Sequence, residues 1–201
     1  MSEINWAELW TTINSNIFLF SLTIAVLLPF AVILVGYAIH MLGLTLAQLA
    51  DLFIDSWIVY AIINYLFFPG VMLHETAHAL FAVLTGAKVT ELALFKRDGD
   101  SLGHVNFRHR GGPILVAVQR IFISSAPMFV GAAVVFGCQH VVFHMATAPL
   151  WLKILAGYIG ISMFFHMTMS PQDIKVYVKG IPVFILILFI EMLLLRFFHI
   201  I

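Results

Sequence analysis

The chain has few charged residues and contains many hydrophobic ones. Only 10% of its 201 residues are Asp, Glu, Lys or Arg, whereas 62% are hydrophobic, and the mean hydropathy is strongly positive. This composition lies outside the range of soluble domains and is typical of an integral membrane protein embedded in a lipid bilayer. The formal net charge is zero. We therefore expect no nucleic-acid partner and no polybasic membrane anchor.

Two further absences narrow the kinds of site the chain could contain. Cys138 is the only cysteine, which excludes an internal disulfide and a zinc site built from several thiolates. Residues 1–10 include Glu3 and Glu8 but no Lys or Arg, so they lack the basic region of a cleavable signal peptide. We therefore expect the first apolar segment to remain as a membrane anchor.

Long apolar segments dominate the rest of the sequence. A helix needs about 20 apolar residues to cross a bilayer. The segments that meet this requirement are residues 17–42, 57–84, 114–136, 150–169 and 181–201. The predicted fold is an all-α polytopic membrane protein with about five transmembrane helices, forming a single domain over residues 1–201. Pro69-Gly70 interrupts the second segment and predicts a kink whose freed carbonyls are buried against neighbouring helices.

Residues 86–112 have a different composition and predict a small β-hairpin. Strand-like stretches at 88–95 and 104–107 flank a segment rich in turn formers, in which Asp98-Gly99 is the sharpest turn signal. The hairpin could be a connector. Alternatively, it could present an exposed sheet edge that pairs with an extended substrate segment.

The basic residues in short loops predict the orientation in the membrane. Most Lys and Arg residues lie in the loops at 86–112 and 170–180. With five crossings, both loops share one side with the amino terminus. Loops rich in Lys and Arg usually face the cytoplasm, so we expect a cytoplasmic amino terminus and a hairpin at the cytoplasmic interface.

The run His74-Glu75-Thr76-Ala77-His78 predicts a metal site within the second apolar segment. Residues four apart lie on one helix face, so His74 and His78 can direct two ring nitrogens at one Zn²⁺, with Glu75 in reach of a water molecule there. The same motif also occurs on solvated helices. Here the surrounding residues are apolar, and burying three unpartnered ionisable groups would cost several kcal/mol. We therefore predict Zn²⁺ as the cofactor.

A catalytic zinc site usually has three protein ligands and water, so one ligand is still missing. Asp173 is a candidate because it follows an apolar segment on the same side as the end of the zinc helix. An alternative is that Ser170, Pro171 and Asp173 only begin a helix, with Ser170 as its N-cap. The other carboxylates and histidines that stay open are Asp51, Asp55, Glu91, Asp98, Asp100, Glu191, His104, His109, His140, His144 and His166.

Four motifs together resemble one known family. They are the zinc motif, the turn Thr85-Gly86-Ala87-Lys88-Val89 that leads into a strand, Ala126-Pro127 in the predicted span 114–136, and Ser170-Pro171-Gln172-Asp173 after the predicted span 150–169. The combination resembles the site-2 protease family of intramembrane zinc metalloproteases. It is most similar to the small prokaryotic members that lack a PDZ domain.

The resemblance implies roles for four residues. His74, His78 and Asp173 would be metal ligands and Glu75 the general base. The implied reaction is hydrolysis of peptide bonds in membrane-spanning or membrane-adjacent substrates. The implied location is a prokaryotic cell membrane. The chain departs from the family at one point. The aspartate of the family motif is usually followed by Gly, whereas Ile174 follows here.

Two alternatives to a protease remain. A catalytically silent zinc-binding membrane protein that regulates or escorts a partner predicts the same metal and fold without turnover. The other alternative is a metal transporter, which would need polar residues that continue across the bilayer. Towards the far side of the membrane from the motif, the second span offers only Tyr60, Asn64 and Tyr65.

Overall fold

The computed structural model describes residues 5–94, 96, 102–198 and 200 and is mostly helical. Its helices are α1 (Trp6–Ser15), α2 (Ile17–Asp51), α3 (Ser56–Ala61), the π-helical η1 (Ile62–Leu66), α4 (Phe68–Leu84), α5 (Pro113–Phe143), α6 (Leu150–His166) and α7 (Pro171–Phe197). The strands are β1 (Lys88–Ala93) and β2 (His104–Arg108). The predicted class, a helical protein with a small β-hairpin, is confirmed.

Three to four elements in the described part of the chain could cross a membrane. α2, α5 and α7 are long and apolar enough, and the bent pair of α3–η1 with α4 would be a fourth. α6 is shorter, with 17 residues, so the predicted count of about five is not confirmed. The first and last predicted spans are also longer than expected, because α2 continues to Asp51 and α7 already begins at Pro171.

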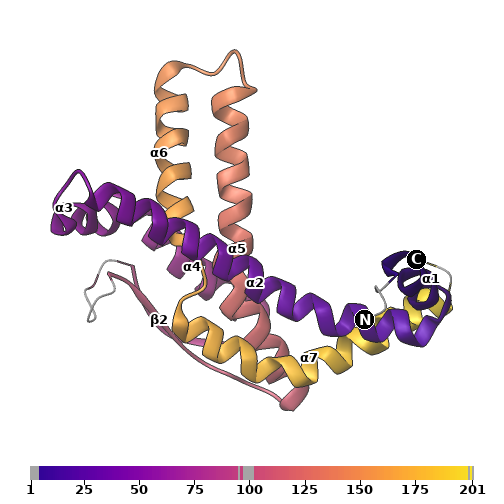
Figure 1. Ribbon diagram of the computed structural model, residues 1–201. Helices are drawn as coiled ribbons and strands as arrows, with labels where there is room; N and C mark the ends of the chain where they lie inside the picture. Colours follow the sequence, from indigo (N-terminus) through magenta and orange to yellow (C-terminus); the bar gives the residue numbers. More distant parts are fainter. Residues whose placement is uncertain (1–4, 95, 97–101, 199, 201) are drawn as a thin grey trace.

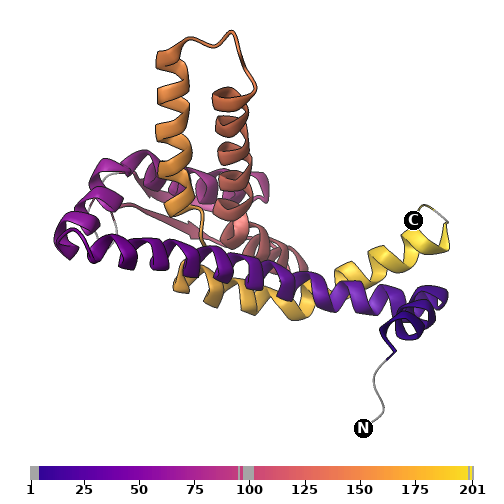
Figure 2. The same ribbon diagram turned by 45° about the horizontal axis from the view of Figure 1, so that its top comes forward.

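The helices form two groups that meet near the middle of the molecule. α5 and α6 form an antiparallel pair whose connection projects away from the rest, while α2 and α7 run side by side in opposite directions (Figures 1 and 2). Ile121 of α5 and Tyr177 and Ile181 of α7 form a buried cluster against α2. The Tyr177 hydroxyl donates to the carbonyl of Pro29 in α2 at 3.2 Å. This contact fixes α7 along α2.

The two ends of the described chain lie together. Arg196, near the end of α7, donates to the side chain of Asn14 in α1 at 3.2 Å, and its guanidinium lies 4.2 Å from the centre of the Phe20 ring. An odd number of crossings would place these ends on opposite faces of a bilayer. The predicted five-crossing arrangement, and the orientation that rests on it, are therefore not confirmed.

The break before α4 matches the predicted kink. α3–η1 and α4 meet at 54° around Phe67. Pro69 lies in the first turn of α4, where its missing N–H is not needed. At the break, the carbonyls of Leu66 and Phe67 accept hydrogen bonds from the hydroxyls of Tyr158 (2.5 Å) and Ser162 (2.6 Å) on α6, and that of Phe67 also accepts from the N–H of Gly70 (3.0 Å). Side chains of α6 thus satisfy the backbone of the broken helix, as required in an apolar environment.

The chain turns from α4 directly into the sheet. Gly86 has a positive φ of 80°, and the N–H of Ala87 donates to the carbonyl of Ala82 at 2.8 Å. β1 and β2 pair antiparallel with a register shift between Val89 and Glu91. The predicted hairpin is confirmed, while the turn at Asp98-Gly99 lies outside the described residues.

Gly70 should tolerate no side chain, because a Cβ atom there would lie 2.2 Å from the backbone oxygen of Ser162. We expect Gly70→Ala to force α4 and α6 apart and to lower the melting temperature in detergent by about 5–10 °C. Gly43→Ala is the matched control, since a Cβ atom at Gly43 has no neighbour within 4 Å. Equal melting temperatures for the two variants would contradict this account of the α4–α6 contact.

Candidate metal centre

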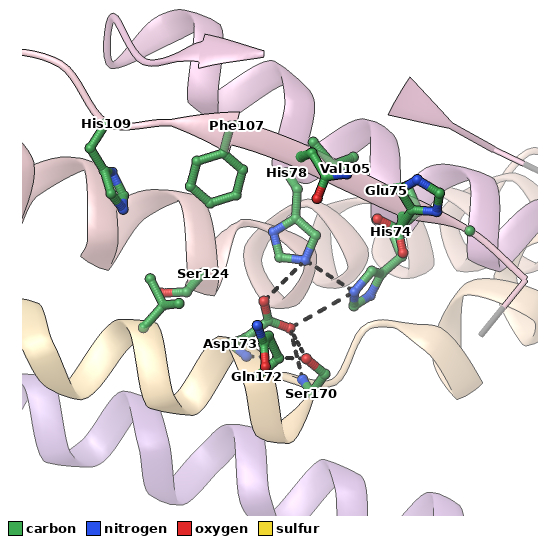
Figure 3. A pocket seen from close by; sticks show the side chains of 14 residues that line it. His74, Glu75, His78, Val105, Phe107, His109, Ser124, Ser170, Gln172 and Asp173 are labelled. Carbon is green, nitrogen blue, oxygen red and sulfur yellow. Dashed lines mark hydrogen bonds and ion pairs between the residues drawn. The ribbon is translucent and has the colours of Figure 1, made fainter. Parts of the chain in front are cut away.

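Three side chains from two helices meet at one point. α4 supplies His74 and His78 from one face, and the first turn of α7 supplies Asp173. Their potential ligand atoms all lie within 4.8 Å of one another, the one such group among the described residues. His78 Nε2 lies 3.4 Å from Asp173 Oδ1, His74 Nε2 lies 4.0 Å from Asp173 Oδ2, and the two Nε2 atoms are 3.1 Å apart (Figure 3).

Backbone carbonyls determine which ring nitrogens can bind a metal. His74 Nδ1 lies 2.5 Å from the carbonyl oxygen of His166, at the end of α6, and His78 Nδ1 lies 2.7 Å from that of Ile123 in α5. A carbonyl can only accept, so each Nδ1 carries the proton. In neutral rings, both Nε2 lone pairs then point at one another beside a carboxylate. These lone pairs would repel each other unless a proton or a metal cation lay between them.

The donor set fits Zn²⁺. Zinc prefers imidazole nitrogen and carboxylate oxygen, and histidine ligands usually donate their other N–H to a backbone carbonyl or a carboxylate. Both histidines have such a carbonyl partner. The residues that would hold the ion are His74, His78 and Asp173.

Asp173 can act as ligand and as helix cap at the same time. Its Oδ2 accepts from the backbone N–H of Ser170 at 2.9 Å and from the Ser170 hydroxyl at 2.6 Å, and its own N–H donates to Ser170 Oγ at 3.1 Å. This is a complete capping box at the start of α7. Oδ1 meanwhile faces His78. The two interpretations of Asp173 are therefore compatible, because each uses a different oxygen.

The other histidine candidates lie outside the three-residue group. His166 directs Nδ1 to the carbonyl of Ser162 in its own helix, and its backbone carbonyl contacts His74. His140 and His144 stack on each other at the end of α5, with ring centroids 5.3 Å apart. His104 and His109 line the nearby cavity without joining the group.

The remaining carboxylate candidates do not join the group either. Asp51 ends α2, Asp55 precedes α3, and Glu191 lies in the second half of α7. Glu91 lies on the hairpin, where it pairs with other side chains. Asp98 and Asp100 lie outside the described residues.

A cavity of about 610 Å³ opens beside the three side chains. Residues 103–107 wall it on one side, and the first turns of α7 and Ser124 of α5 wall it on the other (Figure 3). Glu75 lies in the same cavity and is only 9% exposed. A Cβ atom at Gly103 would lie 2.9 Å from Glu75 Cγ, so the glycine leaves room for this side chain. The sequence offered no signal for Gly103 beyond its position after a turn.

Gln119 fixes the hairpin beside the site and was missed by the sequence analysis. Its fully buried side chain accepts from the N–H of Arg110 at 3.1 Å and donates to the carbonyls of Arg110 (3.0 Å) and Thr85 (3.1 Å). It thereby joins the exit of β2 to the end of α4. An amide side chain within an apolar helix is the signal that could have identified it.

Two ionisable groups on the hairpin side have shifted pKa values. The pKa of the Glu91 carboxyl is lowered below its usual range. The causes are hydrogen bonds from the Asn106 amide and the His104 imidazole, and the charge of the Lys96 ammonium. Burial lowers the pKa of the His109 imidazole, and the charge of Arg120 acts in the same direction. At neutral pH the cavity is therefore bordered by a neutral His109.

No protein-family model, curated protein or solved structure matches this chain. The assignment of the site rests on its own geometry and donor chemistry.

Replacing both His74 and His78 by Ala should remove the metal. We expect about one Zn²⁺ per wild-type chain and none in the double variant, because Asp173 alone offers too few ligands. Elemental analysis of the purified proteins measures this. His140→Ala with His144→Ala removes a second pair of histidines four residues apart and should leave the zinc content unchanged. Stoichiometric zinc in the His74/His78 double variant would place the site elsewhere.

Asp173→Asn and Ser170→Ala should separate the ligand role from the cap role. An amide still accepts hydrogen bonds at the helix start but is a poor zinc ligand, so Asp173→Asn should weaken zinc affinity roughly 100-fold or more, while the melting temperature of the zinc-free protein stays nearly unchanged. Ser170→Ala should instead cost about 1 kcal/mol of stability, with the smaller loss of zinc affinity. Competition with a chelator gives the affinities. Wild-type affinity in Asp173→Asn would show that this carboxylate is only a cap.

Proposed function

We propose that the chain is an intramembrane zinc metalloprotease of the site-2 protease type, which hydrolyses peptide bonds in membrane-spanning or membrane-adjacent substrates. One observation carries the proposal. Two histidines and an aspartate converge beside a buried glutamate in a cavity that is walled by a strand. The long apolar helices support a membrane location.

The metal would be held by His74 Nε2, His78 Nε2 and an oxygen of Asp173. When bound, Zn²⁺ would supply Lewis acidity, which polarises a carbonyl and makes water a nucleophile near neutral pH. The protein supplies orientation. The carbonyls of His166 and Ile123 hold the two imidazoles, and Ser170 holds the carboxylate, so the donors need little rearrangement.

Glu75 is the proposed general base. It follows His74 directly on α4 and shares the cavity with the three donors. Its carboxylate would take the proton of the attacking water and later deliver it to the leaving amine. Gly103 bounds the space around its side chain, which limits the directions in which the carboxylate can turn.

The edge of β2 is the proposed docking place for substrate. Residues 103–107 all line the cavity. Because side chains of consecutive strand residues point to opposite faces of a sheet, one face alone cannot account for this lining. An edge of the strand therefore borders the cavity. β1 is the hydrogen-bonded neighbour of β2 among the described strands, so the other edge can accept an extended segment. A helical substrate must unwind first, because its carbonyls are already hydrogen-bonded.

Glu75→Gln should abolish proteolysis while zinc stays bound, since the amide keeps the shape of the side chain but cannot accept a proton at neutral pH. The measurement is cleavage of a model transmembrane substrate in detergent or proteoliposomes, with zinc content determined in parallel. Glu191→Gln, an exposed position on α7, is the matched control and should cleave like wild type.

Undiminished cleavage by Glu75→Gln would rule out the proposed base. If wild type and variant both bind zinc but neither cleaves any of a panel of membrane substrates, the silent zinc-binding protein is the better account.

A further inference from the structure

Two cations lie directly opposite each other at the base of the hairpin. Lys88 of β1 and Arg108 of β2 are cross-strand partners, and both are exposed. Directly opposite side chains in an antiparallel pair have Cβ atoms about 4.5–5.5 Å apart, and like charges there destabilise the sheet. An anion bound between the two side chains would offset this repulsion.

The hairpin does not supply that anion from its own described residues. Phe107 packs toward Ala82 and Ile123, so Arg108, the next residue, lies on the opposite, outer face of the sheet. Glu91 is the one carboxylate on the described hairpin, and it is already engaged. It contacts Asn106 Nδ2 (3.2 Å), His104 Nε2 (3.3 Å) and Lys96 Nζ (3.5 Å). All three of these residues lie closer to the tip of the hairpin than Lys88 and Arg108 do.

The same holds for the rest of the described chain. Within it, no Asp or Glu oxygen lies within 4.0 Å of a nitrogen of Lys88 or Arg108. Arg110 adds a third exposed cation close to this pair. The backbone N–H and carbonyl of Arg110 are both hydrogen-bonded to the buried Gln119 amide, so the backbone that carries this side chain is fixed.

The base of the hairpin lies where two candidate membrane-crossing elements end. α4 ends at Leu84, shortly before Lys88, and α5 begins at Pro113, shortly after Arg110. Figure 1 shows this base beside the start of α5, opposite the α5–α6 connection. In a membrane crossed by α4 and α5, residues next to these helix ends would lie at the level of the lipid headgroups.

We propose that Lys88, Arg108 and Arg110 form a binding site for the phosphate of an anionic lipid headgroup. The guanidinium groups offer paired N–H donors to phosphate oxygens, and the Lys88 ammonium adds a third charge. Bound lipid would neutralise the cross-strand pair and hold the base of the hairpin at the membrane surface. The proposal does not depend on metal binding or on proteolysis.

The test compares the melting temperature of the full-length protein in neutral detergent, with added phosphatidylglycerol or with added phosphatidylcholine. Phosphatidylglycerol should raise the wild-type melting temperature by at least ~3 °C more than phosphatidylcholine does, and salt should diminish the gain. In Lys88→Gln/Arg108→Gln, the affinity for phosphatidylglycerol should fall roughly tenfold or more. Without lipid, this variant should melt no lower than wild type, because its cross-strand repulsion is gone.

Lys153→Gln/Lys179→Gln is the matched control, since it removes the same charge from α6 and α7 and should keep the wild-type response. The proposal is overturned if the Lys88/Arg108 variant gains as much from phosphatidylglycerol as wild type does, or if both lipids stabilise wild type equally. Equal stabilisation by inorganic phosphate alone would overturn the assignment to a lipid.

Discussion

The convergence of two imidazole nitrogens and a carboxylate at one point is the feature on which the rest of this structure depends. Carbonyls of two other helices hold the Nδ1 protons of His74 and His78, so both Nε2 atoms point inward at a separation of 3.1 Å. A cation between them turns a destabilising cluster into a stabilising one. Because the carbonyls come from α5 and α6 and the carboxylate from α7, one ion would link four helices.

This centre can form only if α4 is held in place along its whole length. At its beginning, the hydroxyls of Tyr158 and Ser162 donate to the backbone carbonyls at the 54° bend, and Gly70 lets α4 approach the backbone of α6. At its end, Gln119 ties the carbonyl of Thr85 to the chain that leaves β2. The histidines lie between these two fixed points, so the metal donors and the wall of the cavity keep a constant separation.

The sequence predicted the local features of the site and the fold. The spacing of His74 and His78 sets their common helix face, Pro69-Gly70 sets the bend, and strand-like stretches on either side of a segment of turn formers indicate the hairpin. Each depends on neighbours a few residues away. Whether the grouped residues bind zinc and catalyse proteolysis stays a prediction.

Features that depend on distant parts of the chain could not be predicted in this way. The carbonyl of Ile123 is backbone and leaves no mark in the sequence, and the space at Gly103 exists only because Glu75 lies against it. The predicted number of crossings is not confirmed, because apolar length says nothing about how helices bend or pair. The contact of Arg196 with Asn14 depends on α2 and α7 running in opposite directions.

X-ray absorption at the zinc edge of the purified protein tests the central claim most directly. The account predicts a first shell of nitrogen and oxygen at about 2.0–2.2 Å, with the outer-shell scattering of two imidazoles and no sulfur. A shell at about 2.3 Å from sulfur, or scattering without imidazole, would contradict the assignment of His74 and His78 as ligands.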